Sequence, residues 1–406
     1  MDAIAIKNSI QLLRKASTEQ GILASTENLA NYRRIWARDG IVCGLAGLLL
    51  EDEIIIASFK ETLLKLAVCI GPHGQIPSNI LIDESGNIED ISYGGIVGRV
   101  DTIPWFVIGV CNYVDFTGDW KFAEKMHSKI KNGLQLLEAW EFNSKGLIYV
   151  PQSGDWADEY IFHGYILYDQ LLRLWAVKCF QKIFDERAGI KDLHELKNLI
   201  KLNFCPKTAN KNSKQLFQPR AFIKVLEKQP EVQYFLPSIT PGGYFLQFDA
   251  LSNALAILLN LPDKKQLSDM LNFGQSLISK NILKMMPCYW PPINESDFEW
   301  EQLQTNYRDQ FRNKPHQYHN GGVWPVINGW WGMALHKAGK KEEAEKLLNA
   351  IHSFNKLETN RGEEWGFYEY GNSKTGEVGG VKHLSWSAAG ALLLSEKLKG
   401  KNLFFA

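Results

Sequence analysis

The sequence predicts an all-α protein in which six helical hairpins close into an (α/α)6 toroid. Apolar residues recur with the helical period along most of the 406 residues, whereas patterns typical of strands are sparse. The predicted helices are of two kinds, because one set is charged and amphipathic and the other is almost free of charge. The two kinds alternate strictly along the chain, six of each, starting with a charged one.

Each charged helix has one polar face and one apolar face, as the segment KKEEAEKLLNAIHSFNK (340–356) illustrates. A helix of this kind covers a core with its apolar face and meets solvent with the other. In chain order, we expect these outer helices at 3–15, 51–70, 119–140, 190–204, 262–284 and 340–356.

The uncharged helices are apolar on every side and must therefore be buried on every side. The third of them is less pure than the others, because it carries Asp169, Arg173 and Lys178. Six buried helices, each preceded by a solvated one, predict an inner and an outer ring. We expect one domain over 1–406, with the β-like stretch 79–89 forming a loop or a small hairpin. In chain order the inner segments are GIVCGLAGLLL (40–50), TIPWFVIGVCNYV (102–114), IFHGYILYDQLLRLWAVKCF (161–180), ALSNALAILLNL (250–261), GGVWPVINGWWGMAL (321–335) and SWSAAGALLLS (385–395).

Composition narrows the classes of partner. The 45 basic and 45 acidic residues give a formal net charge of zero, which argues against nucleic acid or an anionic membrane as the main partner. The apolar runs are too short to span a bilayer and the first residues lack the pattern of a signal peptide, so we expect a cytoplasmic protein. The six cysteines are scattered and mostly lie in apolar runs, which is typical of buried free thiols in a reducing compartment. No spacing of His, Cys and carboxylate residues indicates a catalytic metal, and we expect no cofactor.

The segments that lead into the six buried helices hold the densest groups of glycine, aromatic and acidic residues. Six such loops converge on one end of an inner ring, where they form one pocket with aromatic walls, several carboxylates and the positive ends of helices. The segments are NYRRIWARDG (31–40), SYGGIVGRVD (92–101), VPQSGDWADEY (150–160), TPGGYFLQFD (240–249), KPHQYHNGG (314–322) and EEWGFYEYGNSKTGEVGGVKH (363–383).

Tryptophan recurs in or near these loops, which favours a sugar as the ligand. An aromatic face stacks on the C–H groups of a sugar, while neighbouring carboxylates bond its hydroxyls. Any one tryptophan alone is more often a core residue, but six at corresponding positions favour a sugar pocket. One acid in each loop can instead cap a helix, a role that Asp101, Asp249 and Asn320 fit. The tryptophans concerned are Trp36, Trp105, Trp156, Trp324, Trp365 and Trp386.

Three motifs carry a resemblance to known proteins: YHNGGVWP (318–325), SGDWADE (153–159) and EWGFYEYGNSKTGEVGGVKHLSWSAAG (364–390). At these motifs the chain resembles the six-hairpin glycosidases, namely the amylo-α-1,6-glucosidase (glycogen-debranching) type and the neutral/alkaline invertases. As a pattern of motifs, the resemblance covers nearly the whole chain. It implies a glycoside hydrolase that inverts the anomeric carbon with a pair of carboxylic acids.

The resemblance also implies roles for single residues. The last motif is similar to an invertase segment with a Glu-Tyr-Tyr core, a Thr/Ser-Gly step and a following Trp-Ser-x-Ala-Gly, which makes Glu369 the general base. Trp-Ala-Asp is similar to the Trp-Met-Asp of debranching glucosidases, which makes Asp158 the general acid. WARD (36–39) is similar to the Arg-Asp pair that holds hydroxyls of the non-reducing sugar. We expect the substrate to be surrounded by Trp36, Arg38, Asp39, Asp101, Trp105, Asp155, Trp156, Tyr318, His319, Asn320, Trp324, Glu364, Trp365, Lys382 and Trp386.

The expected substrate is a small α-glucoside, with sucrose as one candidate. Where typical invertases follow the acid with Arg-Arg-Met-Gly-Ile and a Gly-His-Pro-Leu-Glu-Ile-Gln helix, this chain reads EYIFHGYILYDQ (159–170). The large N-terminal domain of debranching enzymes is not part of this sequence, which favours a short substrate over a branched glucan. An exo-glucosidase on longer glucans stays open, and so does the oligomeric state.

Other assignments stay open as well. Asp155 is a rival to Asp158 as the acid, and Glu364 is a rival to Glu369 as the base. A sugar epimerase on the same toroid would use a pair of histidines, and a phosphorolytic enzyme would need a cationic cluster for phosphate. A sugar-binding protein without catalysis should lack one of the two carboxylates. The histidines near the loops are His163, His316, His319 and His383, and the cations there are Arg33, Arg34, Arg38 and Lys382.

Overall fold

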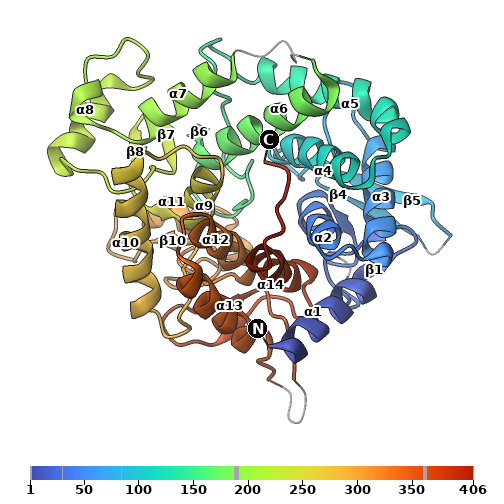
Figure 1. Cartoon of the computed structure of the whole chain (residues 1–406). Helices are drawn as coiled ribbons and strands as arrows, with labels where there is room; N and C mark the ends of the chain where they lie inside the picture. Colours follow the sequence, from blue (N-terminus) through green and yellow to red (C-terminus); the bar gives the residue numbers. More distant parts are fainter. Residues whose placement is uncertain (1, 30, 84, 187–191, 360–363, 406) are drawn as a thin grey trace.

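The computed structural model describes residues 2–29, 31–83, 85–186, 192–359 and 364–405. These residues form mainly α-helices joined by loops and short strands, which confirms the all-α class. Six helices form a closed inner ring, because each packs against the next and the last returns to the first (Figure 1). In ring order they are α2 (Ala37–Leu50), α4 (Thr102–Thr117), α6 (Leu167–Phe184), α9 (Ala250–Leu258), α12 (Pro325–Lys337) and α14 (Ser385–Leu398).

Six amphipathic helices of the described chain surround this ring, and each packs mainly on one inner helix. Residues 190 and 191 of the expected helix 190–204 lie outside the described residues. The outer helices, in the order of the inner helices just given, are α3 (Glu53–Val68), α5 (Trp120–Ala139), α7 (Leu193–Phe204), α10 (Lys264–Lys280), α13 (Lys341–Asn355) and α1 (Ala3–Ala16).

The two rings begin their helices differently. Most outer helices start at an aspartate whose side chain accepts a backbone N–H of the first turn, which satisfies a donor that the helix itself cannot pair. These caps are Asp2, Asp52, Asp119, Asp192 and Asp263.

Among the inner helices of the described chain, only α9 has a side-chain cap, from Asp249 to the N–H of Ser252 at 3.0 Å. The caps expected at Asp101 and Asn320 do not form, because both side chains have other partners. The first turns of the other inner helices therefore present their positive ends to the loops around them.

Elements outside the two rings are short. The expected hairpin at 79–89 is confirmed as β4 (Asn79–Ile82) and β5 (Ile88–Ser92), which extend β3 (Ile35–Trp36) into an antiparallel sheet. The inner segment 161–180 becomes helical only at Leu167, because Tyr165–Ile166 pairs as strand β6 with β7. The sequence did not predict α8 (Pro219–Lys228), α11 (Trp300–Thr305), η1 (Thr208–Asn210) or η2 (Arg308–Gln310). The remaining strands are β1 (Ser17–Thr18), β2 (Gly21–Ile22), β7 (Ser238–Thr240), β8 (Gly243–Phe245), β9 (Phe248–Asp249), β10 (Tyr289–Trp290), β11 (Tyr370–Gly371) and β12 (Val378–Gly379).

The buried side chains form one continuous cluster through both rings, with a small second cluster at Ile35, Cys69 and Ile80. All six cysteines are free and buried.

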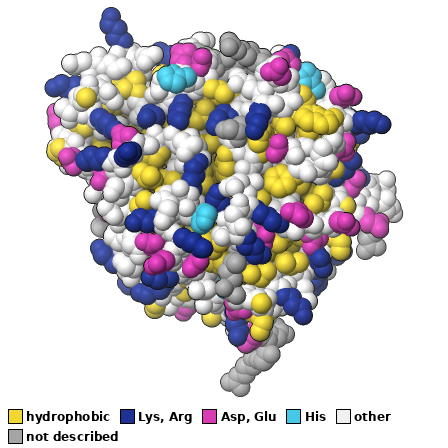
Figure 2. Space-filling model, in the orientation of Figure 1, with side chains coloured by type: hydrophobic (Ala, Val, Ile, Leu, Met, Phe, Trp, Pro, Cys, Tyr) yellow, Lys and Arg dark blue, Asp and Glu magenta, His cyan; other side chains and the backbone are white. Residues whose placement is uncertain are grey.

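A single domain over 1–406 stays a prediction. No described helix combines the length and the apolar character needed to cross a bilayer. Figure 2 shows basic and acidic side chains interspersed over one face of the molecule.

The chain after α14 crosses the middle of the ring (Figure 1). There Phe404 accepts a hydrogen bond from Trp175 of α6 at 2.8 Å and donates its N–H to Asn112 of α4 at 2.9 Å. The ring of Phe405 stacks on Trp175 with 4.5 Å between ring centroids. This segment therefore packs on α4 and α6 away from the N-terminal ends of these helices.

The close packing between α12 and α14 can be tested by adding a methyl group at their contact. A Cβ added at Gly329 would lie 2.3 Å from the carbonyl oxygen of Gly390, a backbone atom that cannot rotate away. We expect Gly329→Ala to lower the free energy of unfolding by about 1–3 kcal/mol, as overpacking does, although alanine has the higher helix propensity. Thermal melting measures the loss. The matched control is Gly242→Ala, whose Cβ meets only Thr240 at 3.6 Å, and equal melting temperatures for the two variants would contradict the packing.

Candidate active site

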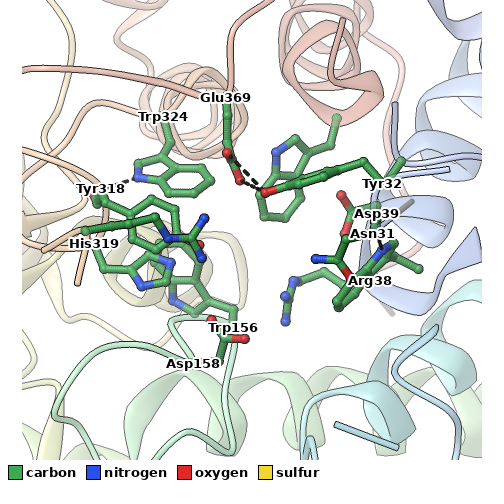
Figure 3. Close-up of a pocket in the computed structure, with 14 residues that line it drawn as sticks. Asn31, Tyr32, Arg38, Asp39, Trp156, Asp158, Tyr318, His319, Trp324 and Glu369 are labelled. Atoms are coloured by element: carbon green, nitrogen blue, oxygen red, sulfur yellow. Dashed lines mark hydrogen bonds between the residues drawn. The ribbon is translucent and has the colours of Figure 1, made fainter. Parts of the chain in front are cut away.

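One pocket lies at the N-terminal ends of the inner helices, where the loops before α2, α6, α12 and α14 meet (Figure 3). It holds about 560 Å³ of space, a volume that includes open solvent at its mouth. The lining residues are Ala24, Asn31, Tyr32, Trp36, Arg38, Asp39, Trp156, Asp158, Arg312, Tyr318, His319, Trp324, Glu369 and Trp386.

Aromatic rings form one wall of the pocket. The indole of Trp324 lies nearly parallel to the His319 ring, with centroids 5.5 Å apart, and perpendicular to Trp156 at 5.7 Å and to Trp386 at 5.9 Å. Its Nε1 donates to the carbonyl of Tyr318 at 3.0 Å, which fixes the ring. The wall offers rigid apolar faces of the kind that stack on sugar rings.

Glu369 stands on one side of the pocket, immediately before β11 (Figure 3). Its carboxylate accepts a long hydrogen bond from the Tyr32 hydroxyl, at 3.4 Å, and one from the N–H of Val381 at 3.2 Å. The side chain is nearly fully buried, and this burial raises the pKa of Glu369 to about 7, although the Val381 N–H and the Arg312 charge act in the opposite direction.

The absence of a side chain at Gly380 provides the space that the Glu369 carboxylate occupies. The φ of Gly380 is +75°, in the region that favours glycine, and an added Cβ would lie 2.2 Å from Oε2 of Glu369.

Asp158 lies on the other side of the pocket, facing the space below Glu369 (Figure 3). Its Oδ2 accepts a hydrogen bond of 2.6 Å from Nη2 of Arg99, a buried residue of the loop before α4. The same guanidinium donates to the carbonyl of Ser153 and so holds both ends of the loop 153–158. The two carboxyl groups with predicted catalytic roles therefore face one space from opposite walls.

Arg38 and Asp39 come from the first turn of α2 and also line the pocket. Nη1 of Arg38 donates to Oδ2 of Asp101 at 2.5 Å, and this carboxylate accepts a second bond from the Tyr168 hydroxyl at 3.2 Å. Nε1 of Trp105 donates in turn to Tyr168 at 2.8 Å. Asp101 and Trp105 therefore lie behind Arg38 and not on the pocket surface, where we expected them.

Two further expected residues are buried in the structure behind the lining. Asp155 is 1% exposed and accepts a hydrogen bond from the N–H of Ala157 at 3.0 Å. The amide of Asn320 bonds the backbone of Ile293 at 2.7 and 2.8 Å and the carbonyl of Asn313 at 3.1 Å, which ties the segment 293–313 to the loop before α12.

Three expected residues in the segment before α14 do not line the pocket. Glu364 is exposed and forms an ion pair with Lys356 at 3.2 Å. Lys382 pairs with Glu358 at 3.4 Å, and Trp365 lies outside the lining residues.

Sequence reasoning missed Ala24, Asn31, Tyr32 and Arg312 as lining residues. Asn31 and Tyr32 lie in the segment 31–40, whose position before an inner helix was a usable signal. Arg312 follows a long irregular segment with no motif. Its guanidinium pairs with Glu159, with Nε 3.2 Å from Oε2, and lies over the Tyr318 ring at 4.3 Å from the centroid.

The described residues contain no group of three or more His, Cys, Asp or Glu side chains arranged to hold a metal ion. Of the four histidines singled out in the sequence, only His319 lines the pocket. Burial, assisted by the charges of Arg312, Arg38 and Arg99, holds the pKa of His319 well below its usual range, so its imidazole is neutral.

Comparison with solved structures supports the fold. The GH63 mannosylglycerate hydrolase from Thermus thermophilus superposes with a TM-score of 0.67 at 14% identity, covering 96% of this chain and 100% of that one. A bacterial glucoamylase complexed with acarbose gives 0.62 at 18% identity, over 98% of this chain and 56% of that one. Both likenesses place the chain in the (α/α)6 glycosidase fold class.

Sequence relatives are more specific. Alkaline/neutral invertase C, mitochondrial, of Arabidopsis thaliana is 24% identical over 92% of this chain and 63% of its own length. Neutral/alkaline invertase 1, mitochondrial, of Oryza sativa subsp. japonica is 24% identical over 91% of this chain and 65% of its own length. The chain thus spans somewhat less than two thirds of these relatives. The family model described as alkaline and neutral invertase matches residues 190–401, more than half of the 406 residues, and this chain therefore belongs to the alkaline and neutral invertase family.

Proposed function

We propose that this chain is an inverting glycoside hydrolase that acts on an uncharged α-glucoside of disaccharide size, with sucrose as the first candidate. One observation carries the proposal: Asp158 and Glu369 face a single aromatic pocket from opposite walls. Membership of the invertase family supports both the reaction and the substrate class. Inversion needs two carboxyl groups about 6.5–9.5 Å apart, with a water molecule between the sugar and one of them.

Asp158 is the proposed general acid, which protonates the leaving oxygen. Arg99 then stabilises the carboxylate that remains after the proton has left. Glu369 is the proposed general base, which removes a proton from the attacking water. The N–H of Val381 and the Tyr32 hydroxyl orient its carboxylate.

The pocket charges favour an uncharged substrate. Arg38 and Arg312, the two lining cations, already pair with Asp101 and Glu159. An anionic leaving group would have to break one of these ion pairs. The mannosylglycerate hydrolase of similar fold acts, by its name, on a conjugate of glycerate, and this chain offers no unpaired lining guanidinium for such a group.

The rival assignments find less support. Asp155 is buried behind the lining, and Glu364 is exposed outside it. Epimerisation by a histidine pair would need a second imidazole beside His319, and the lining residues include none. Of the cations considered for phosphorolysis, only Arg38 lines the pocket. A cytoplasmic location stays a prediction, since the relatives' names include mitochondrial, chloroplastic and cytosolic forms.

A hydrolysis screen tests the proposal. Sucrose, trehalose, maltose, isomaltose, glycogen and mannosylglycerate should be compared, with NMR of the first anomer released. We expect sucrose or another neutral disaccharide to be the best substrate and β-glucose to appear first from an α-glucoside. Release of α-glucose would contradict inversion, and faster release from glycogen than from any disaccharide would favour an exo-glucosidase on longer glucans.

Isosteric variants test the division of labour. We expect Asp158→Asn and Glu369→Gln each to lower kcat by about 10²–10⁴-fold, the usual contribution of a positioned proton-transfer group, with unchanged melting temperature. An activated glucosyl fluoride should rescue Asp158→Asn, because its leaving group needs little protonation, and should rescue Glu369→Gln much less. Near-normal turnover by either variant would move the role to another carboxylate.

The pKa of Glu369 predicts the acid limb of the pH profile. A general base must be ionised, so kcat/KM should rise with pH along a limb whose midpoint lies near pH 7. Because the charge of Arg312 lowers this pKa, Arg312→Gln should move the limb to higher pH. Arg308→Gln, at an exposed position of the same segment, is the control and should leave the limb in place. A limb that does not respond to Arg312 would argue against Glu369 as the base.

Alanine variants at two glycines of one hairpin distinguish the effect of displacing Glu369 from the effect of backbone strain. Gly380 and Gly376 have φ values of +75° and +79°, so alanine strains both positions alike. Only at Gly380 does the added Cβ meet Glu369, whereas at Gly376 the nearest atom lies 3.5 Å away on Leu283. We expect Gly380→Ala to lower kcat by roughly 10²-fold, as misplacement of a catalytic group does, and Gly376→Ala to keep kcat while losing similar stability. Steady-state kinetics and melting curves measure both.

A further inference from the structure

Four buried carboxyl groups lie behind the pocket, close enough for their charges to interact. Asp101, Asp155, Asp169 and Asp249 are each 0 or 1% exposed and come from four different segments. Arg38 is the cation that interacts with Asp155 and Asp169, and its guanidinium is already paired with Asp101. We call these four residues the buried acid cluster.

The buried acid cluster has too few hydrogen-bond donors to hold four carboxylates. Oδ1 of Asp101, Oδ2 of Asp155 and both oxygens of Asp169 have no hydrogen-bond partner within the described chain. A buried carboxylate without donors is strongly unfavourable when ionised. Burial, together with the charges of Asp101 and Asp249, accordingly raises the pKa of Asp155 to about 8. Burial and the charges of Asp155 and Asp101 raise the pKa of Asp169 well above its usual range.

Asp155 also contacts the loop that carries the proposed acid. Its Oδ1 accepts the N–H of Ala157 at 3.0 Å, which closes a turn whose next residue is Asp158. On the other side, Arg99 holds Asp158 and the carbonyl of Ser153. The loop is thus held from outside by a charged pair and from inside by one buried carboxyl group.

We propose that Asp155 is a positioning residue for Asp158: as a buried, uncharged carboxylic acid, it holds the turn that presents Asp158 to the substrate. This inference rests on the proposed function, in which Asp158 is the general acid. It gives Asp155 no contact with substrate. The charged and titratable groups that face Asp155 are Asp101 just before α4, Asp169 of α6, Asp249 of β9, Arg38 of α2, Tyr289 of β10 and Asp158 of its own loop.

The variant Asp155→Asn removes the titratable group at position 155 but keeps a hydrogen-bond acceptor. Its amide oxygen can still accept the Ala157 N–H, and it has no proton to lose. We expect Asp155→Asn to keep kcat within about threefold of wild type at pH 7, and Asp155→Ala, which lacks the acceptor, to lose about tenfold in kcat with little change in KM. Asp249→Asn is the matched control, because Asp249 belongs to the same cluster but bonds Ser252 at the start of α9. It should keep kcat within about threefold of wild type even if it melts at a lower temperature.

A second measurement needs no substrate. Because the pKa of Asp155 is higher in the folded chain than the ordinary 3.8, the folded state holds this proton more tightly. The contribution of Asp155 to wild-type stability therefore falls as the pH rises from about 4 to about 8. Asp155→Asn escapes that loss. The difference in melting temperature, variant minus wild type, should therefore grow between pH 5 and pH 9.

The outcomes separate this inference from the proposed function. A loss in Asp155→Asn as large as that in Asp158→Asn would make Asp155 the acid itself and overturn the inference. Equal kcat for the asparagine and alanine variants would show that the turn needs no hydrogen bond, and would also overturn it. A wild type that hydrolyses none of the screened glycosides would overturn the proposed function instead. In that case the melting curves still test the inference. If the difference in melting temperature between Asp155→Asn and wild type does not grow with pH, Asp155 is not uncharged in the folded chain.

Discussion

Closure of six fully buried helices into one ring is the constraint on which the rest of the structure depends. Helices that are buried on all sides leave most of their charged groups to the loops at their ends. The C-terminal segment with Phe404 packs on α4 and α6 inside the ring, and the pocket lies at the N-terminal ends of the inner helices. Because most inner helices start without a side-chain cap, their positive ends act on the same loops that carry the carboxylates.

The two carboxyl groups of the pocket are distinguished by their neighbours and not by their residue type. Glu369 sits in a dry environment with two long hydrogen bonds, which makes its negative charge costly. Asp158 has a direct ion pair with Arg99, contributed by a loop that otherwise stays behind the lining.

The sequence predicted the two rings and most of the pocket, because burial on all sides and burial on one side leave different patterns of charge. It did not determine which side of a loop faces the pocket. Asp101 and Trp105 lie in the expected loop and helix but point to Tyr168 behind Arg38, a choice made by packing between α4 and α6. Arg312 could not be predicted at all, since its place depends on how an irregular segment docks on Glu159.

The contact of α14 with α2 has a consequence for how the protein is made on the ribosome. The first inner helix, α2, can complete its packing only after the last one, α14, has been synthesised. The two helices are neighbours in space but more than three hundred residues apart in sequence. Pairings of such high contact order form late and slowly. Until α14 emerges, the apolar flank of α2 has no partner and can bind chaperones or other nascent chains. Glu369 and Trp386 also belong to this last stretch, so a partly synthesised chain has an incomplete pocket.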